Sequence, residues 1–325
     1  MRKTVKIYWI TAGLLILLGS MILLGVFMTM NWDFSKLSTE KYETNRYEVA
    51  EPYRDIRITT NRVDITFTRA NDGKTSVTAY ENSRVKHGVS VKDGVLTIET
   101  NDERKWYHHI GITFTQPKLT VALPDEEYGA LMMENTTGDI DIPNGFTFTE
   151  ATLESTTGDI AFAASVGGKM AITTTTGDIA LCGFSAGELS LSLTTGDLSL
   201  TDVTCRGDMT VDVSTGDVIF KKGLCQNLIA SGASGDFVMK NVIASGKFEI
   251  TRTTGDVTFD GCDASEIYIS LTTGDVSGSL LSEKVFIPHV TTGDVELPKT
   301  TSGGICEITT TTGDITITIK EGAAS

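Results

Sequence analysis

Residues 136–140 read Thr-Thr-Gly-Asp-Ile, and residues 156–160 repeat the same five letters. The phrase returns at intervals of 19 or 20 residues, with small substitutions before the glycine, as far as residue 314. A fixed period of this length is typical of stacked units that are each too small to bury a core alone. The repeat therefore decides the fold. Its aspartates are Asp139, Asp159, Asp178, Asp197, Asp217, Asp236, Asp256, Asp275, Asp294 and Asp314.

Apolar residues recur at fixed places around each aspartate. They stand eight and six residues before it and one and three residues after it, with few exceptions such as Gly278 and Pro288. A spacing of two predicts short β-strands, and the many glycines and threonines disfavour helix. Two strands and two turns in each unit predict an all-β fold, a parallel β-solenoid (β-helix) of about ten coils over residues 131–320.

Each Thr-Thr-Gly-Asp phrase is expected to form a corner between two strands. Glycine permits a positive φ in a tight bend, and an aspartate side chain accepts backbone N–H groups at a turn. Stacking would align the threonines into a ladder of mutually bonded hydroxyls. It would also align the ten carboxylates about 4.8 Å apart.

The row of carboxylates leaves two interpretations open. Backbone donors can offset the repulsion between neighbours, or cations such as Ca²⁺ can bind along the row. Calcium takes about six to eight oxygen ligands, which are hard to assemble from one aspartate per coil. We therefore predict no catalytic residue, no cofactor and no defined metal site, and keep the ten aspartates as a candidate cation ladder.

The first thirty residues predict a membrane segment. Residues 7–30 carry no charge, and this uncharged segment is long enough to cross a bilayer as a helix. Arg2, Lys3 and Lys6 precede this run, so the positive-inside rule places residues 1–6 in the cytoplasm. A cleaved signal peptide is the alternative, but the run is long and ends without a good cleavage site. The prediction is a single-pass signal-anchor in the cell membrane, with everything after it extracytoplasmic.

The segments flanking the repeat are less regular. Residues 31–49 are polar and predict a stalk, and residues 321–325 a tail. Residues 50–130 contain short alternating runs and an Asp93-Gly94 turn typical of a β-hairpin. We expect irregular β-structure that caps the solenoid, whose end coils would otherwise expose unpaired backbone groups. Trp106-Tyr107-His108-His109 is either a metal- or ligand-binding loop or an aromatic loop packed on this cap.

The net charge limits the classes of partner that are expected, and the cysteine pattern limits the kinds of site. Acids outnumber bases by 42 to 27, a net charge of −15, which disfavours nucleic acid as a partner. The five cysteines include no C-x-x-C pair, so neither a zinc site nor a redox motif is indicated. Cys205 and Cys225 each follow a repeat aspartate by eight residues and should stack on adjacent coils. They are either a disulfide or two small buried apolar side chains.

An N-terminal anchor, an irregular β lead-in and repeated Thr-Thr-Gly-Asp corners followed by Ile or Val resemble a known family. It is the bacterial "putative adhesin" β-helix family of unknown function, which includes LiaG-like accessory proteins of cell-envelope stress. The resemblance covers about residues 50–320. It implies a β-helix in a Gram-positive cell envelope and suggests surface binding, and it supplies no catalytic residues.

Topology and resemblance together favour a non-enzymatic, membrane-anchored extracytoplasmic solenoid. Such a protein would act as an adhesin or envelope accessory protein that binds an envelope protein or a cell-wall or surface glycan. A polysaccharide-active β-helix enzyme is one alternative, although the acids outside the corners, such as Asp141, Asp202 and Asp260, form no obvious row. A cation-binding structural rod is the other.

Overall fold

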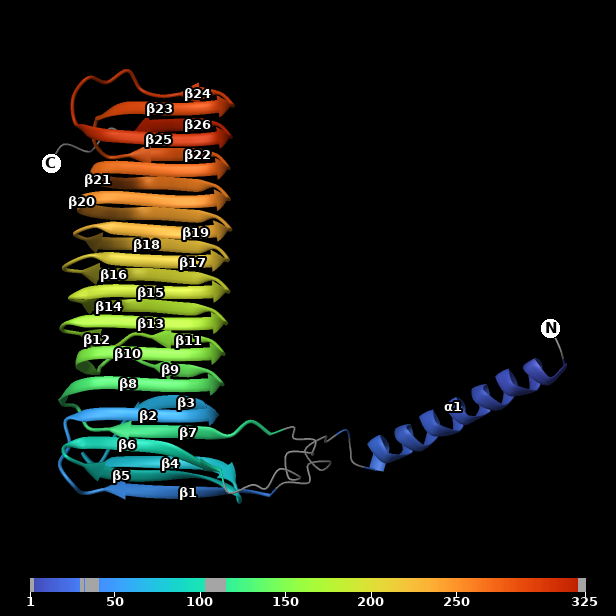
Figure 1. Cartoon of the computed structure of the whole chain (residues 1–325). Coiled ribbons are helices and arrows are strands. Elements are labelled where there is room, and N and C mark those ends of the chain that lie inside the picture. The colour runs from blue at the N-terminus through green and yellow to red at the C-terminus, as the bar shows by residue number, and fades with distance from the viewer. Residues whose placement is uncertain (1–2, 30–31, 33–40, 103–114, 321–325) are drawn as a thin grey trace.

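The computed structural model describes residues 3–29, 32, 41–102 and 115–320. Its strands stack one above another into a single long rod (Figure 1). Every repeat unit contributes one coil with two parallel strands, so the predicted β-solenoid is confirmed. The helix α1 (Lys3–Thr29) precedes the strands. Its segment Tyr8–Thr29 has a mean hydropathy of 2.5 and is long and apolar enough to cross a membrane.

The rod has two faces, because each coil places one strand on either side of the corner. The first face carries the strands that lead into the corners, preceded at the N-terminal end by two strands of the cap. In stacking order these are β5 (Val85–Lys92), β6 (Val95–Asp102), β2 (Asp55–Arg62), β8 (Glu127–Thr137), β10 (Thr147–Thr157), β13 (Lys169–Thr176), β15 (Glu188–Thr195), β17 (Met209–Thr215), β19 (Leu228–Ser234), the second halves of β20 (Phe237–Thr254) and β21 (Val257–Thr273), β25 (Gly304–Thr312) and β23 (Lys284–Thr292).

The second face carries the strands that leave the corners, preceded at the N-terminal end by three strands of the cap. In stacking order these are β1 (Tyr42–Val49), β4 (Thr75–Asn82), β7 (Lys118–Leu123), β3 (Asp64–Arg69), β9 (Ile140–Ile142), β11 (Ile160–Phe162), β14 (Ile179–Ala186), β16 (Leu198–Cys205), β18 (Val218–Cys225), the first halves of β20 and β21, β22 (Val276–Leu280), β26 (Ile315–Ile319) and β24 (Val295–Glu296). The short strand β12 (Ser165–Val166) pairs with the start of β10.

A continuous apolar core runs between the two faces. The residues eight and six before each aspartate and one after it are buried in almost every coil, from Leu131 to Ile315. Alternate residues point outward and are mostly exposed, as the spacing of two requires. The exceptions gather on the coil formed by β23 and β24, where Pro288 is exposed and Val295 keeps 45% of its surface accessible.

The N-terminal end is closed by a different kind of sheet. Strands β2 and β3 form a first coil that stacks on β8 and β9, although 75 residues separate Ile56 from its partner Leu131. On the other side of this first coil the chain builds antiparallel pairs, β1 with β4, β4 with β7 and β5 with β6. The predicted hairpin is β5–β6, with positive φ at both Asp93 and Gly94. Residues 50–130 therefore hold both the first coil and its cap.

The predicted stalk is wrong for its second half. Residues 42–49 form β1, an edge strand paired antiparallel with β4. Its Tyr47 and Val49 pack partly against the core, so this polar segment is held by two apolar contacts and a neighbouring strand edge. The Trp106–His109 segment, which we proposed as a loop, lies outside the described residues.

At the C-terminal end the coils do not stack in chain order. Strand β21 pairs with β25 rather than with β23, and β22 pairs with β26 rather than with β24. The last coil of the chain is thereby inserted beneath the coil that precedes it, which becomes the end of the rod (Figure 1). Proline lacks a backbone donor and suits an edge strand. Pro288 and the exposed Val295 therefore fit the terminal coil better than an interior one.

Candidate functional site

The aspartates of the corners join neighbouring coils. In each corner except that of the terminal coil, aspartate Oδ1 accepts the backbone N–H of the aspartate in the next coil, at 2.8 to 3.1 Å. Asp64 begins the row, so the segment at residues 59–64 is a further corner without glycine. The row then follows the stacking order and ends with Asp275, Asp314 and Asp294. The backbone N–H groups that donate these hydrogen bonds belong, in stacking order, to Asp139, Asp159, Asp178, Asp197, Asp217, Asp236, Asp256, Asp275, Asp314 and Asp294.

The glycines of the corners are required by close stacking as well as by their conformation. Gly216 has φ +141°, and a Cβ added to it would lie 1.8 Å from the carbonyl oxygen of Gly196 in the coil below. No side chain fits in that space. The backbone of each corner therefore rests directly on the previous corner, which brings the aspartate N–H within reach of the neighbouring carboxylate.

The predicted threonine ladder is not how the corners are joined. The corner threonines lie in register, as Thr157, Thr176 and Thr195 do. Within residues 41–102 and 115–320, however, no hydrogen bond links the hydroxyls of two stacked corner threonines. The corner threonines instead contribute backbone carbonyls, such as that of Thr157, which accepts the N–H of Gly138. Hydrogen bonds between neighbouring coils are made by aspartate carboxylates and backbone groups, because the close stacking already holds these groups within hydrogen-bond distance.

An arginine lies buried beneath the middle of the row. Arg252 is 2% exposed, and its guanidinium donates to the carbonyls of Gly216 and Ser234. Burial lowers the pKa of Arg252, whereas the charges of Asp217 and Asp236 act to raise it. It fits because Gly232, its partner on the adjacent coil, leaves room for the side chain. Arg252 was not predicted from the sequence, although a charge at an inward position of one coil was visible there.

The cysteines are all free thiols. Cys205 and Cys225 are buried near one another on adjacent coils, as expected, and burial raises the pKa of Cys225 to about 12. Cys182 is exposed. The apolar interpretation of Cys205 and Cys225 is the one that the structure supports.

A pocket at the N-terminal end holds a buried Glu–His pair. Glu81 on β4 is fully buried and accepts hydrogen bonds from the His87 backbone N–H at 2.7 Å, from Asn45 at 2.7 Å and from the Tyr47 hydroxyl at 3.3 Å. The Nδ1 of His87, on β5, lies 2.6 Å from the same carboxylate. With Nδ1 bound in this way, the other ring nitrogen, Nε2, is directed away from Glu81. Nε2 is buried and has no hydrogen-bond partner.

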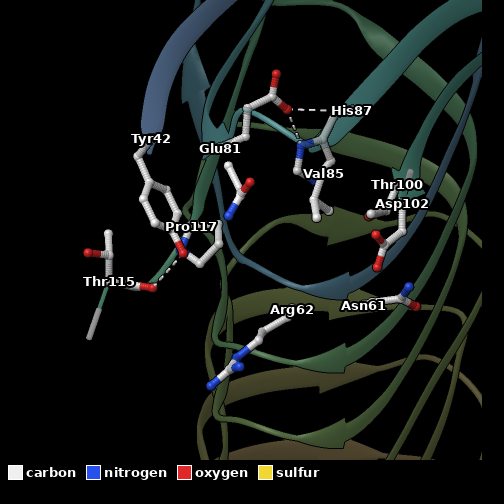
Figure 2. A pocket seen from close by; sticks show the side chains of 11 residues that line it. Tyr42, Asn61, Arg62, Glu81, Val85, His87, Thr100, Asp102, Thr115 and Pro117 are labelled. Carbon is white, nitrogen blue, oxygen red and sulfur yellow. Dashed lines mark hydrogen bonds and ion pairs between the residues drawn. The ribbon is translucent and has the colours of Figure 1, made fainter. Parts of the chain in front are cut away.

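The pocket around this pair has an acidic side chain at one end and a basic side chain at the other. Figure 2 shows Glu81 and His87 at one end and Arg62 at the other. Its empty volume of about 560 Å³ includes open solvent at the mouth. No sequence pattern indicated this pocket, because its residues lie between positions 42 and 117 and share no motif. The described lining residues are Tyr42, Asn61, Arg62, Glu81, Asn82, Val85, His87, Thr100, Asp102, Thr115 and Pro117.

Comparison with known proteins finds one family. A family model described as Toastrack DUF4097 matches residues 53–222 and again residues 206–325. None of the curated proteins matches the chain. Among solved structures, a "putative lipid binding protein" from Parabacteroides distasonis is 18% identical, with 75% of this chain and 98% of that chain covered and a TM-score of 0.49.

Two further solved structures are adhesin-like by name. A "putative adhesin" from Parabacteroides distasonis is 12% identical, covering 86% of this chain and 98% of that chain, with a TM-score of 0.47. A "putative adhesin" from Bacteroides fragilis is 17% identical, covering 86% and 97%, with a TM-score of 0.37. These values are too low to carry an argument, so the assignment depends on the family model, which spans most of the chain.

Proposed function

Because the chain belongs to the Toastrack DUF4097 family, we propose that it is a membrane-anchored, extracytoplasmic adhesin-like rod that binds an envelope or surface partner without catalysing a reaction. Family membership agrees with the resemblance drawn from the repeated corners. The observation that carries the proposal is the presence, on one chain, of a helix able to cross a membrane and a long rod. The rod holds its regular acids in backbone hydrogen bonds.

The placement of the anchor supports a projecting rod. The segment between α1 and β1 is short, and at about 3.3–3.6 Å per residue it spans at most roughly 40 Å. Strand β1 lies at one end of the stack and β24 at the other. The stacked coils, at about 4.8 Å each, extend over roughly 50 Å. A chain inserted through α1 would keep the β1 end near the membrane and hold the other coils away from it.

A binding surface on such a rod would have to stand out from its polar exterior. Leu224 and Ile243 occupy stacked outward positions on β18 and β20 and are 53% and 37% exposed. Ile219, on the same strand as Leu224, is 36% exposed. Exposed apolar side chains of this size are the usual contacts of protein partners. We place the first test on this surface.

The test is crosslinking in the native envelope. A photoreactive amino acid at position 224 should trap a discrete partner, while the same group at Thr253, on the other face, serves as the control. Purified rod would be assayed in parallel against envelope proteins and cell-wall fragments. If neither position traps a partner and the rod binds nothing from the envelope, the proposal is wrong. Release of sugar from a glycan panel would instead support a polysaccharide-active enzyme.

A further inference from the structure

The pocket beside Glu81 and His87 is built from two neighbouring cross-strand pairs. His87 faces Thr100, and Val85 faces Asp102, in the antiparallel pairing of β5 with β6. Residues two apart on a strand share a face, so these four side chains stand side by side, about 5 Å apart across the strands. All four line the pocket.

Two polar atoms of residues that line this pocket lack hydrogen-bond partners. His87 Nε2 and Thr100 Oγ1 are both buried and neither makes a hydrogen bond. The His87 side chain is only 3% exposed. Buried polar groups are nearly always satisfied, and each exception calls for an explanation. Two such atoms, on facing residues of one strand pair that both line the pocket, indicate that a ligand group or an ordered water completes the site.

The His87 ring is held in one orientation. Glu81 lies 2.6 Å from Nδ1 and also accepts the His87 backbone N–H and groups of Asn45 and Tyr47. A carboxylate with three other donors remains an acceptor, so Nδ1 carries the proton that faces it. Nε2 is thereby left for an incoming group. This is the preorganisation expected of a binding site.

The charges around the pocket exclude a simple ion. The Arg62 side chain at one end disfavours a cation, and the Asp102 carboxylate, with Glu81 behind it, disfavours an anion. Asn61 and Thr100 each offer both a donor and an acceptor. Across from them, Tyr42 and Pro117 present carbon surfaces (Figure 2). A ligand that suits this lining is neutral, has hydroxyls along one edge and has an apolar face.

We propose that this pocket binds a neutral sugar residue, such as the end of a glycan chain. A pyranose ring has both required surfaces, C–H groups on its face and hydroxyls around its edge. Its hydroxyls would meet Thr100 Oγ1 and His87 Nε2, directly or through one water, and its face would lie against Tyr42. This inference rests on the proposed function, because it names the chemistry of one surface partner.

The test uses the full-length protein in detergent and a panel of methyl glycosides of glucose, galactose and N-acetylglucosamine, titrated by calorimetry or ligand-observed NMR. At least one glycoside should bind saturably. Thr100→Val should weaken that binding about tenfold. This variant should fold normally, because the hydroxyl it removes has no protein partner. Asn61→Ala should also weaken binding.

The matched control is Thr97→Val, on β6 but not among the residues that line the pocket; its binding should equal that of the parent. Three outcomes would overturn the inference: no glycoside binds, binding is unaffected by Thr100→Val and Asn61→Ala, or Zn²⁺ alone binds with one-to-one stoichiometry and is lost in His87→Gln. In each of these cases, partner trapping at position 224 can still succeed. A failure of the sugar site is therefore distinguishable from a failure of the proposed function.

Discussion

At the scale of single residues, the corner depends on two side chains for separate reasons. Glycine is needed because a carbonyl of the coil below occupies the space of a Cβ, and aspartate because its Oδ1 satisfies an N–H of the coil above. Neither role is catalytic. The repetition of the phrase is explained by the fact that each coil must be joined to the next in the same way.

Gly216→Ala tests the stacking of corners. The added Cβ would lie 1.8 Å from the Gly196 carbonyl at a φ of +141°, so we expect a loss of about 3 kcal/mol of unfolding free energy. Gly183→Ala is the control, because φ there is +64° and no atom lies within 4 Å; it should cost only about 1 kcal/mol. Denaturant unfolding measures both. Equal losses would mean that close stacking contributes nothing.

Two substitutions at Asp178 distinguish the contribution of its hydrogen bond from the contribution of its charge. Its Oδ1 accepts the Asp197 N–H at 2.8 Å. Asp178→Ala should cost about 1 kcal/mol in thermal or chemical unfolding, whereas Asp178→Asn keeps an acceptor oxygen and should cost less. The cation ladder is tested by the same pair: if Ca²⁺ binds the row, added CaCl₂ should raise the Tm of the parent chain more than that of Asp178→Asn. An equal rise in both would count against the ladder.

At the scale of elements, the exchanged order of the last coils has a measurable consequence. Strand β25 is paired on both sides, by β21 and β23, whereas β23 is paired by β25 alone. Amides of an edge strand open more readily than those of an interior strand. Hydrogen exchange should therefore be faster in residues 284–292 than in residues 304–312, although the latter lie closer to the C-terminus. Slower exchange in residues 284–292 would show that the coils stack in chain order.

An ion pair fastens the end of β26 and should make it sensitive to acid. Asp260 lies 2.5 Å from Lys320 and 2.9 Å from Lys240, and these lysines lower the pKa of Asp260 to about 2. A lowered carboxyl pKa stabilises the folded state above the ordinary value near 3.9, and the contribution is lost as the pH falls toward 2. Comparing the Tm of Asp260→Asn with that of the parent should show a difference near pH 6 that shrinks as the pH falls and vanishes only below pH 2.

At the scale of the whole molecule, the proposed membrane topology can be tested by the accessibility of the native cysteine thiols to a chemical label. Cys182 is the exposed cysteine, and the other four are buried. A maleimide that cannot cross membranes should label intact cells at Cys182, and Cys182→Ser should abolish the labelling. Labelling only after permeabilisation would place the rod inside the cell. The buried thiols should react only after unfolding, because burial raises the pKa of Cys306, as of Cys225, to about 12.

The structure of a single coil was predictable from the amino-acid sequence alone. The spacing of two, the period of 19 or 20 residues and the Thr-Thr-Gly-Asp corner are local features, so they identified the buried positions, the turns and the β-solenoid from residue 131 onward. They also indicated that the corner aspartates accept backbone N–H groups. That the donor belongs to the next coil, as in Asp197 to Asp178, was visible only in the structure.

The way in which the two ends of the rod are built depends on long-range packing and was not predictable from the sequence. Near-identical coils can stack in more than one order, and the choice depends on which coil tolerates an open edge, as the coil with Pro288 does. The β1 strand and the pocket at Glu81 and His87 are likewise made by segments far apart in the chain, whose contacts leave no periodic trace. Local patterns specify a repeating unit, whereas long-range packing decides what its ends can bind.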